Sequence, residues 1–163
     1  DNQRASTPRS ARRCRHEARR GARRPWYRRR VSSQPALQAA LLCRRVVCDV
    51  TTSEHTLVDI VLALSVRELP VVEPLQVYLC LTGVAEALRL RVELGKVGEA
   101  EIVFRGELAV DSPDGTFPYQ RVLGVASPPV RVRFGSAGHY ELRVFQAAAL
   151  LGTMPLLVVA EAG

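Results

Sequence analysis

The side chains that could do chemistry in this chain are few and scattered. Its thiols and imidazoles are Cys14, Cys43, Cys48, Cys80, His16, His55 and His139. A thiolate beside an imidazole can act as an activated nucleophile. Zinc needs closely spaced ligands, and Cys43, Cys48, Cys80 and His55 lack that spacing, with no C-x-x-C pair in the chain. We therefore interpret these residues as core thiols and surface imidazoles.

Further catalytic and metal-binding patterns are missing as well. Asp111 and Asp114, with nearby Glu107, could offer oxygen ligands to calcium, but their run lacks the alternating ligands of a calcium loop. A turn over residues 111–115 is the simpler interpretation. No nucleophile elbow, phosphate-binding loop, dinucleotide motif or H-E-x-x-H is present. The sequence predicts a protein that is not an enzyme and holds no metal or cofactor.

The cysteines are expected to be free thiols buried in a core. In a strand, the odd spacing of Cys43 and Cys48 sends their side chains to opposite faces, which disfavours a bond between them. A cross-strand pair of Cys48 with Cys80 stays open as an alternative.

The strongest charge feature is an arginine-rich tail over residues 1–35, which holds twelve arginines against Asp1 and Glu17, a balance of +10. The remaining residues, 36–163, carry 11 basic and 14 acidic groups. Arginines can neutralise phosphates, and aromatic side chains can stack on unpaired bases. The candidate phosphate or nucleic-acid contacts are Arg12, Arg13, Arg19, Arg20, Arg23, Arg24, Trp26, Tyr27, Arg28, Arg29 and Arg30.

The tail also allows two interpretations without a binding role. It could be a disordered solubilising segment, or untranslated upstream sequence ahead of a start near Val31, since the only methionine is Met154 and the chain has 22 arginines to one lysine. No apolar run of 18 residues and no convincing export signal occurs, so we expect a cytoplasmic protein without a membrane span.

The rest of the chain alternates apolar and polar residues with the period of a strand. Such runs cover 43–50, 57–66, 75–82, 88–94, 102–110, 130–134, 140–144 and 156–159. The last run is apolar on both faces, which is typical of a central strand. Glycine- and proline-rich turns separate the runs. These patterns predict an all-β fold, a single antiparallel β-sandwich over residues 36–163, preceded by the disordered tail.

The body resembles a family of uncharacterised bacterial β-sandwich domains of unknown function. The likeness rests on Ala40-Leu41-Leu42-Cys43, Cys48-Asp49, Leu69-Pro70 and the segment Ala137 to Val144, and it spans about residues 38–160. Arg44-Arg45 departs from the acidic or aromatic residue usual in that family. The resemblance implies an immunoglobulin-like layout of about seven to nine strands and no activity.

The expected function is that of a non-catalytic interaction or structural module. A protein partner or a second copy would bind at the edge strands and hairpin loops, where a sandwich exposes unpaired backbone. The alternative is a nucleic-acid-binding protein that uses the arginine tail. A third hypothesis is an accessory subunit of an enzyme whose active site lies on its partner.

Overall fold

The computed structural model describes residues 35–52, 54–84, 86–111 and 122–161. Within these ranges the chain forms strands and no helix, so none is long and apolar enough to cross a membrane. The strands are β1 (Ala36–Cys48), β2 (His55–Ile60), β3 (Ala63–Val66), β4 (Val71–Thr82), β5 (Leu88–Lys96), β6 (Ile102–Val110), β7 (Leu123–Ala126), β8 (Val130–Phe134), β9 (Gly138–Gln146) and β10 (Ala149–Ala160).

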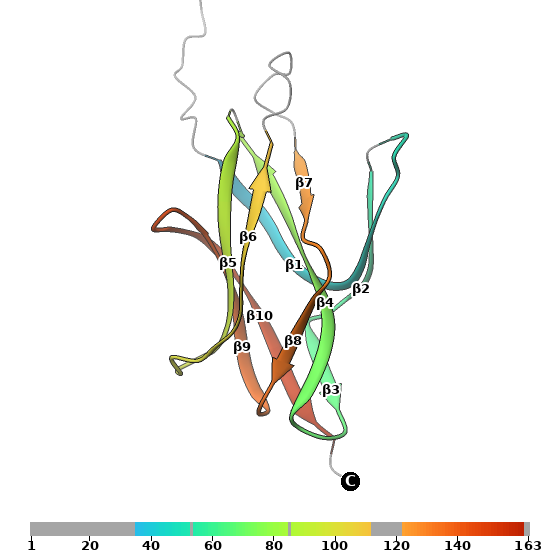
Figure 1. Ribbon diagram of the computed structural model, residues 1–163, viewed down its shortest axis with the longest axis vertical. Coiled ribbons are helices and arrows are strands. Elements are labelled where there is room, and N and C mark those ends of the chain that lie inside the picture. Colours follow the sequence, from blue (N-terminus) through green and yellow to red (C-terminus); the bar gives the residue numbers. More distant parts are fainter. Residues whose placement is uncertain (1–34, 53, 85, 112–121, 162–163) are drawn as a thin grey trace, which may run out of the picture. The chain divides into compact units, whose positions relative to one another are not determined.

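These strands make two facing sheets (Figure 1). The first, sheet A, has the order β2-β1-β4-β7, with β8 also paired to β4; the second, sheet B, has the order β3-β10-β9-β5-β6. Every pair is antiparallel except β3 with β10. The prediction of a β-sandwich is confirmed. The ten strands exceed the expected number because one predicted run is two strands and β7 was not anticipated.

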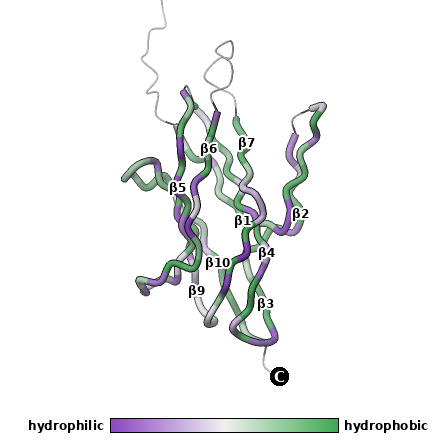
Figure 2. The backbone as a smooth tube through the Cα atoms, viewed as in Figure 1, coloured by the Kyte–Doolittle hydropathy of each residue, from purple (hydrophilic) through white to green (hydrophobic). Residues whose placement is uncertain are grey.

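The core lies between the sheets and is built from alternate apolar residues. Its fully buried members include Leu75, Val77, Leu79, Leu81, Leu90, Val92, Leu94, Leu142, Val144 and Leu156. Phe134 and Tyr140 pack edge to face among them, with ring centroids 5.2 Å apart. Figure 2 shows the resulting alternation of apolar and polar residues along the strands. Each such side chain contributes about 1.5–3 kcal/mol by leaving water.

The predicted strand over 57–66 is wrong, because the chain leaves sheet A after Ile60 and enters sheet B at Ala63. Asp59 takes a left-handed conformation with φ of 53°, and the Val61 N–H donates to the Leu42 carbonyl at 2.8 Å. This change of direction shifts the alternation by one residue. Val61 is therefore buried, whereas Ile60 and Leu62 are exposed by 49 % and 61 %.

The part of β1 that pairs with β2 leans away, together with β2, from the rest of sheet A (Figure 1). Strand β1 begins at Ala36, seven residues before the predicted start at Cys43, and pairs Cys43 with Ile60 and Cys48 with His55. The turn after β1 is held by Asp49, whose Oδ1 accepts hydrogen bonds from backbone N–H groups two and three residues on. This local bond pattern is typical of an aspartate turn.

A polar side chain ties three segments of sheet A together behind the core. Gln76 is buried, and its Oε1 accepts the Val46 N–H at 2.7 Å while its Nε2 donates to the Ser127 carbonyl at 2.8 Å. The Ser127 hydroxyl accepts the Val77 N–H at 2.9 Å. Because buried polar groups cost free energy when unpaired, these bonds fix where the chain leaves β7.

Candidate interaction surface

The outer face of β10 is apolar although only its inner face is buried. Met154, Leu156 and Val158 lie in the core, whereas Leu157 and Val159 are 37 % and 40 % exposed on the other side. The strand is central in sheet B, as predicted, but the expectation that both of its faces are covered is not met among the described residues. In an open antiparallel sheet the solvent side is normally polar.

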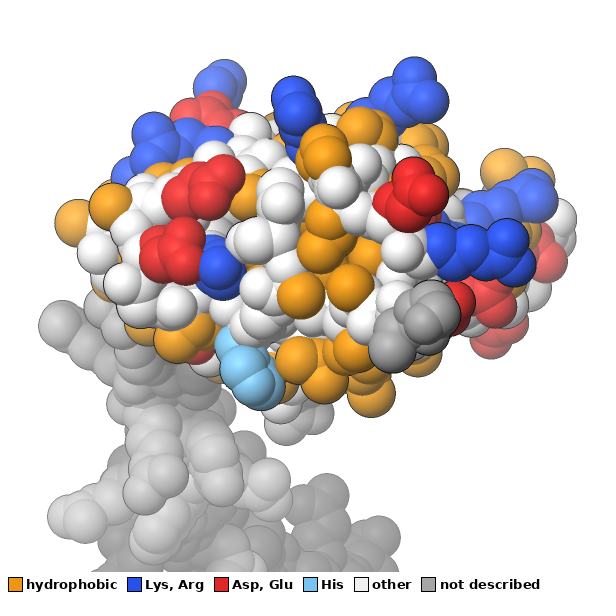
Figure 3. Space-filling view, turned by 90° about the horizontal axis from the view of Figure 1, so that it is seen from below, with side chains coloured by type: hydrophobic (Ala, Val, Ile, Leu, Met, Phe, Trp, Pro, Cys, Tyr) orange, Lys and Arg blue, Asp and Glu red, His pale blue; other side chains and the backbone are white. Residues whose placement is uncertain are grey.

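We call this exposed surface the apolar strip. Its members are Ala63, Pro155, Leu157 and Val159, from β3 and β10. Ala63 is the direct partner of Leu157 in the β3–β10 pair. Figure 3 looks at the end of the sandwich that carries the β3–β4 and β8–β9 turns; hydrophobic side chains also reach the surface there, with charged ones above them and to the sides.

The other half of the same outer face is charged. Cross-strand pairing places Arg143 of β9, Glu93 of β5 and Arg105 of β6 in one row. The Glu93 carboxylate is almost buried, because its Oε1 lies 3.0 Å from Nε of Arg105 and 3.3 Å from Nε of Arg91. We call Arg91, Arg105 and Arg143 around Glu93 the guanidinium cluster. Two of these three cations therefore contact the carboxylate, and the third, Arg143, is its cross-strand neighbour.

Neighbouring side chains hold the guanidinium groups in place. The Arg91 guanidinium carbon lies 4.5 Å from the centre of the Phe145 ring, a cation–π contact. The Arg143 side chain lies against Gly95, where an added Cβ atom would come within 2.8 Å of the Arg143 Nη2 atom. The Nε atoms of Arg91 and Arg143 are buried without a hydrogen-bond partner among the described residues. The cluster thus holds more donors than its own acceptors satisfy.

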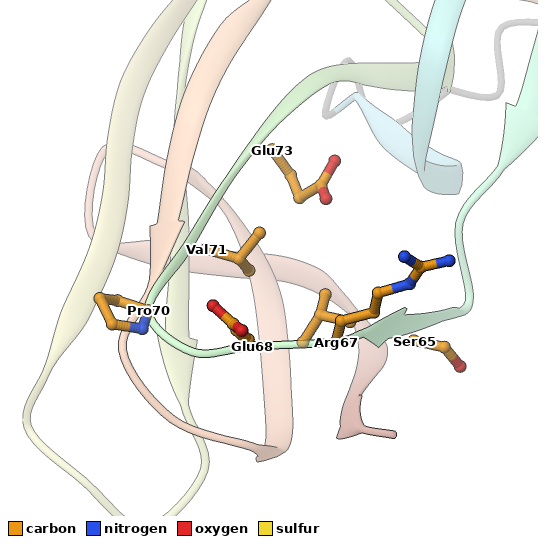
Figure 4. A pocket seen from close by; sticks show the side chains of 7 residues that line it. Ser65, Arg67, Glu68, Pro70, Val71 and Glu73 are labelled. Carbon is orange, nitrogen blue, oxygen red and sulfur yellow. The ribbon is translucent and has the colours of Figure 1, made fainter. Parts of the chain in front are cut away.

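A cavity of about 490 Å³ opens at the β3–β4 turn. Its polar lining residues are Ser65, Arg67, Glu68 and Glu73, and Figure 4 shows that the Arg67 guanidinium points away from Glu68. Glu73 forms an ion pair with Arg44. The lining holds no thiol or imidazole and therefore no base beside a nucleophile.

Of the predicted thiols and imidazoles, the structure places Cys48 opposite His55 in the β1–β2 pair, but no hydrogen bond joins their side chains. Cys48 is exposed and donates to the Asp49 carbonyl, while the His55 ring packs edge to face on Tyr78 with centroids 5.6 Å apart. Cys80 lies opposite Ala39, so the open alternative of a Cys48–Cys80 bond is wrong. Burial raises the pKa of the Cys43 thiol, which disfavours its reactive thiolate.

Of the three thiols described, only Cys43 is buried; Cys80 is partly exposed and Cys48 exposed, so the expected core thiols are confirmed for one residue.

Among the described residues no group of three histidines, cysteines or carboxylates could hold a metal ion. Glu107, considered for calcium, lies 3.8 Å from Arg89, and Asp114 lies outside the described residues. Burial raises the pKa of the Tyr78 hydroxyl as well.

The arginines from Arg12 to Arg30, with Trp26 and Tyr27, lie outside the described residues. Their predicted contact with phosphates or nucleic acid therefore stays a prediction. So does the boundary between the tail and the body at residue 35.

The guanidinium cluster was missed by sequence reasoning, which used the polar residues of these strands only as evidence of strand alternation. A signal was present, because arginines alternate with apolar residues in the segments that became β5, β6 and β9. The alternation shows that Arg143, Arg105 and Glu93 point outward. It does not show which of them are neighbours across strands.

Comparison with known proteins leaves the chain without a family. No protein-family model matches it, and no curated protein is significantly similar to it. No family match supports the resemblance described for residues 38–160. Of what that resemblance implies, the structure shows the β-sandwich.

Proposed function

We propose that the body is a non-catalytic module that binds another protein through the outer face of sheet B. The observation that carries the proposal is the outward apolar side of β10, where Leu157 and Val159 occupy positions that polar residues usually take. Contiguous exposed apolar side chains mark interaction sites on otherwise polar surfaces. The charged cluster beside the strip supplies a polar border.

The proposed contact differs from the edge strands and loops expected from the sequence. Edge strand β2 still exposes Val58 and Ile60 beside its unpaired backbone. However, Asp59 interrupts that edge with a charge and a left-handed backbone, two features that discourage a further strand. We therefore place the proposed contact on the outer face of sheet B.

The experiment compares Leu157→Asp with Leu150→Asp in the full chain. Both leucines are exposed on β10, but Leu150 lies near the start of the strand, away from the apolar strip. Tagged proteins are captured from the native source and their partners quantified by mass spectrometry. We expect Leu157→Asp to lose partners that wild type and Leu150→Asp retain, with unchanged thermal unfolding in both variants. Identical partner sets in all three proteins would contradict the proposal.

A second candidate function rests on the charge of residues 1–35, and we propose it as the alternative. Twelve arginines would bind nucleic acid without sequence preference, with an affinity that falls as salt rises. The test compares the full chain with a variant whose arginines from Arg12 to Arg30 are glutamines. We expect a much shallower salt dependence of RNA binding in the variant. Equal binding by both chains would contradict this candidate.

A further inference from the structure

We propose that the guanidinium cluster is a carboxylate-binding site and that the partner of this face is an acidic peptide segment of another protein. The inference rests on the proposed function and names the chemistry of the partner. It predicts that the bound segment places apolar side chains on the apolar strip and a glutamate or aspartate among Arg91, Arg105 and Arg143.

The first argument is the number of donors left over inside the cluster. Arg91 and Arg105 both approach Glu93 through their Nε atoms, so their terminal nitrogens form no ion pair among the described residues. Arg143 forms no ion pair there at all; its Nε is buried and out of reach of a ligand, so the donors that it can offer are its terminal nitrogens. A guanidinium offers five N–H donors, and two parallel bonds to a carboxylate are its strongest arrangement. The cluster therefore has donors for a second carboxylate.

The second argument is that these groups are already oriented. Phe145 supports the Arg91 guanidinium, Glu93 holds both Arg91 and Arg105, and Gly95 leaves the space into which Arg143 settles. Groups held in place before binding lose less conformational entropy when a partner arrives. A solvated set of unrelated surface arginines would have no such supports.

The third argument concerns the kind of ligand. The cluster lies on an open sheet face, whereas small molecules bind mostly in concave sites. Two further carboxylates share this face: Glu107 lies 3.8 Å from Arg89, and Glu141 is the cross-strand partner of Gly95. The phosphates of a nucleic acid lying along this face would be repelled by these carboxylates. A single carboxylate placed at the cluster avoids them, which favours a peptide over a nucleic acid.

The distance between the apolar strip and the guanidinium cluster determines how the bound peptide must space its apolar and acidic residues. Arg143 pairs with Thr153 of β10, and Leu157 lies four residues farther along the same strand. At about 3.3 Å per residue, Leu157 of the apolar strip and Arg143 of the cluster are roughly 13 Å apart along the strand direction. An extended peptide would therefore carry its acidic residue about four positions from its apolar residues.

The test uses two synthetic peptides and residue-resolved NMR of the full chain. One peptide has two leucines, three serines and two glutamates, and the other replaces the glutamates by glutamines; both are acetylated and amidated. Because the arginines of residues 1–35 also attract glutamates, affinity is read from the backbone amide shifts of β5, β6, β9 and β10. We expect the glutamate peptide to bind there at least tenfold more tightly.

Variants separate the cluster from general positive charge. Arg143→Gln and Arg105→Gln should each reduce the preference for the glutamate peptide toward that of the glutamine peptide. Arg133→Gln, an exposed arginine on β8 of the other sheet, is the matched control and should leave the preference unchanged. Arg105 is largely exposed, so its variant is expected to fold even if Arg143→Gln does not, and thermal unfolding checks both.

The outcomes distinguish this inference from the proposed function. Equal affinities of the two peptides, or no shift in β5, β6 and β9, would overturn the carboxylate site. Partner loss in Leu157→Asp would then still support the interaction module. A short oligonucleotide that shifts the same amides more strongly than the glutamate peptide would also overturn the inference. So would self-association of the free protein that Leu157→Asp abolishes, since a second copy would then cover the face.

Discussion

Replacing Gln76 tests whether the polar link behind the core stabilises the sandwich. In Gln76→Ala, the Val46 N–H and the Ser127 carbonyl both lose their side-chain partner. Each buried group left unpaired costs about 1–3 kcal/mol. Val46 is only half-buried, so its share lies at the lower end. We therefore expect the free energy of unfolding to fall by about 2–4 kcal/mol.

The assay is urea unfolding followed by circular dichroism. With a slope of about 2 kcal/mol per molar urea, the midpoint should fall by about 1–2 M. Gln38→Ala is the matched control, because Gln38 donates to the Thr82 hydroxyl at 2.9 Å on the exposed surface. Its loss should cost less than about 0.5 kcal/mol.

A third variant, Gln76→Met, separates hydrogen bonding from packing. Methionine keeps most of the side-chain volume but offers neither the amide donor nor its oxygen acceptor. We expect Gln76→Met to lose nearly as much stability as Gln76→Ala. Equal midpoints for Gln76→Ala and Gln38→Ala would refute the reasoning, and a near-wild-type Gln76→Met would assign the effect to volume instead.

Three further predictions concern the charged and titratable groups. Glu93→Ala leaves the guanidinium cluster without its carboxylate and should lower stability by about 1–2 kcal/mol. That loss should shrink in 0.5 M salt, because salt at roughly this strength screens repulsion between the guanidinium groups; a loss that salt leaves unchanged in thermal unfolding would contradict the account. Iodoacetamide should label exposed Cys48 well before Cys43, whose pKa is raised by burial; equal rates in peptide mass spectrometry of the native protein would refute this order. Hydrogen bonds from the N–H groups of Thr51 and Thr52 lower the pKa of Asp49, so the stability that its charge contributes is present above pH 3.8 and lost as the pH falls through the lower folded value. Asp49→Asn cannot titrate and should show a flatter dependence of the urea midpoint on acid pH; parallel curves for both proteins would exclude this contribution.

Much of the fold could be predicted from the sequence because strand alternation is a local property. The run over 102–110 has the same bounds in the structure as in the prediction, since Leu108 and Val110 alternate with outward polar residues and turns flank them. The same reasoning failed at 57–66, where the backbone of Asp59 changes the phase of the alternation. No side-chain pattern in that run indicates the crossing.

The interaction surface could not be predicted because it depends on which strands are neighbours. Glu93 meets Arg143 and Arg105 only through the β9–β5–β6 order of sheet B. Outward apolar residues in β10 were visible in the sequence, but they were consistent with burial on both sides. Gln76 illustrates the opposite error: the alternation of the run over 75–82 places its polar side chain on the face away from the core, yet the structure buries it against Ser127 and β1.

The parallel pairing of β3 with β10 has a consequence for how the protein forms during synthesis. Strand β3 leaves the ribosome early, but its only partner in the described part of sheet B is the last strand described. Such distant pairings close long loops and slow folding. Sheet B therefore cannot assemble in order of translation, and β9 must also wait for β10 on one of its sides. Until β10 emerges, the edges of β3 and β9 that it covers in the folded protein stay unpaired.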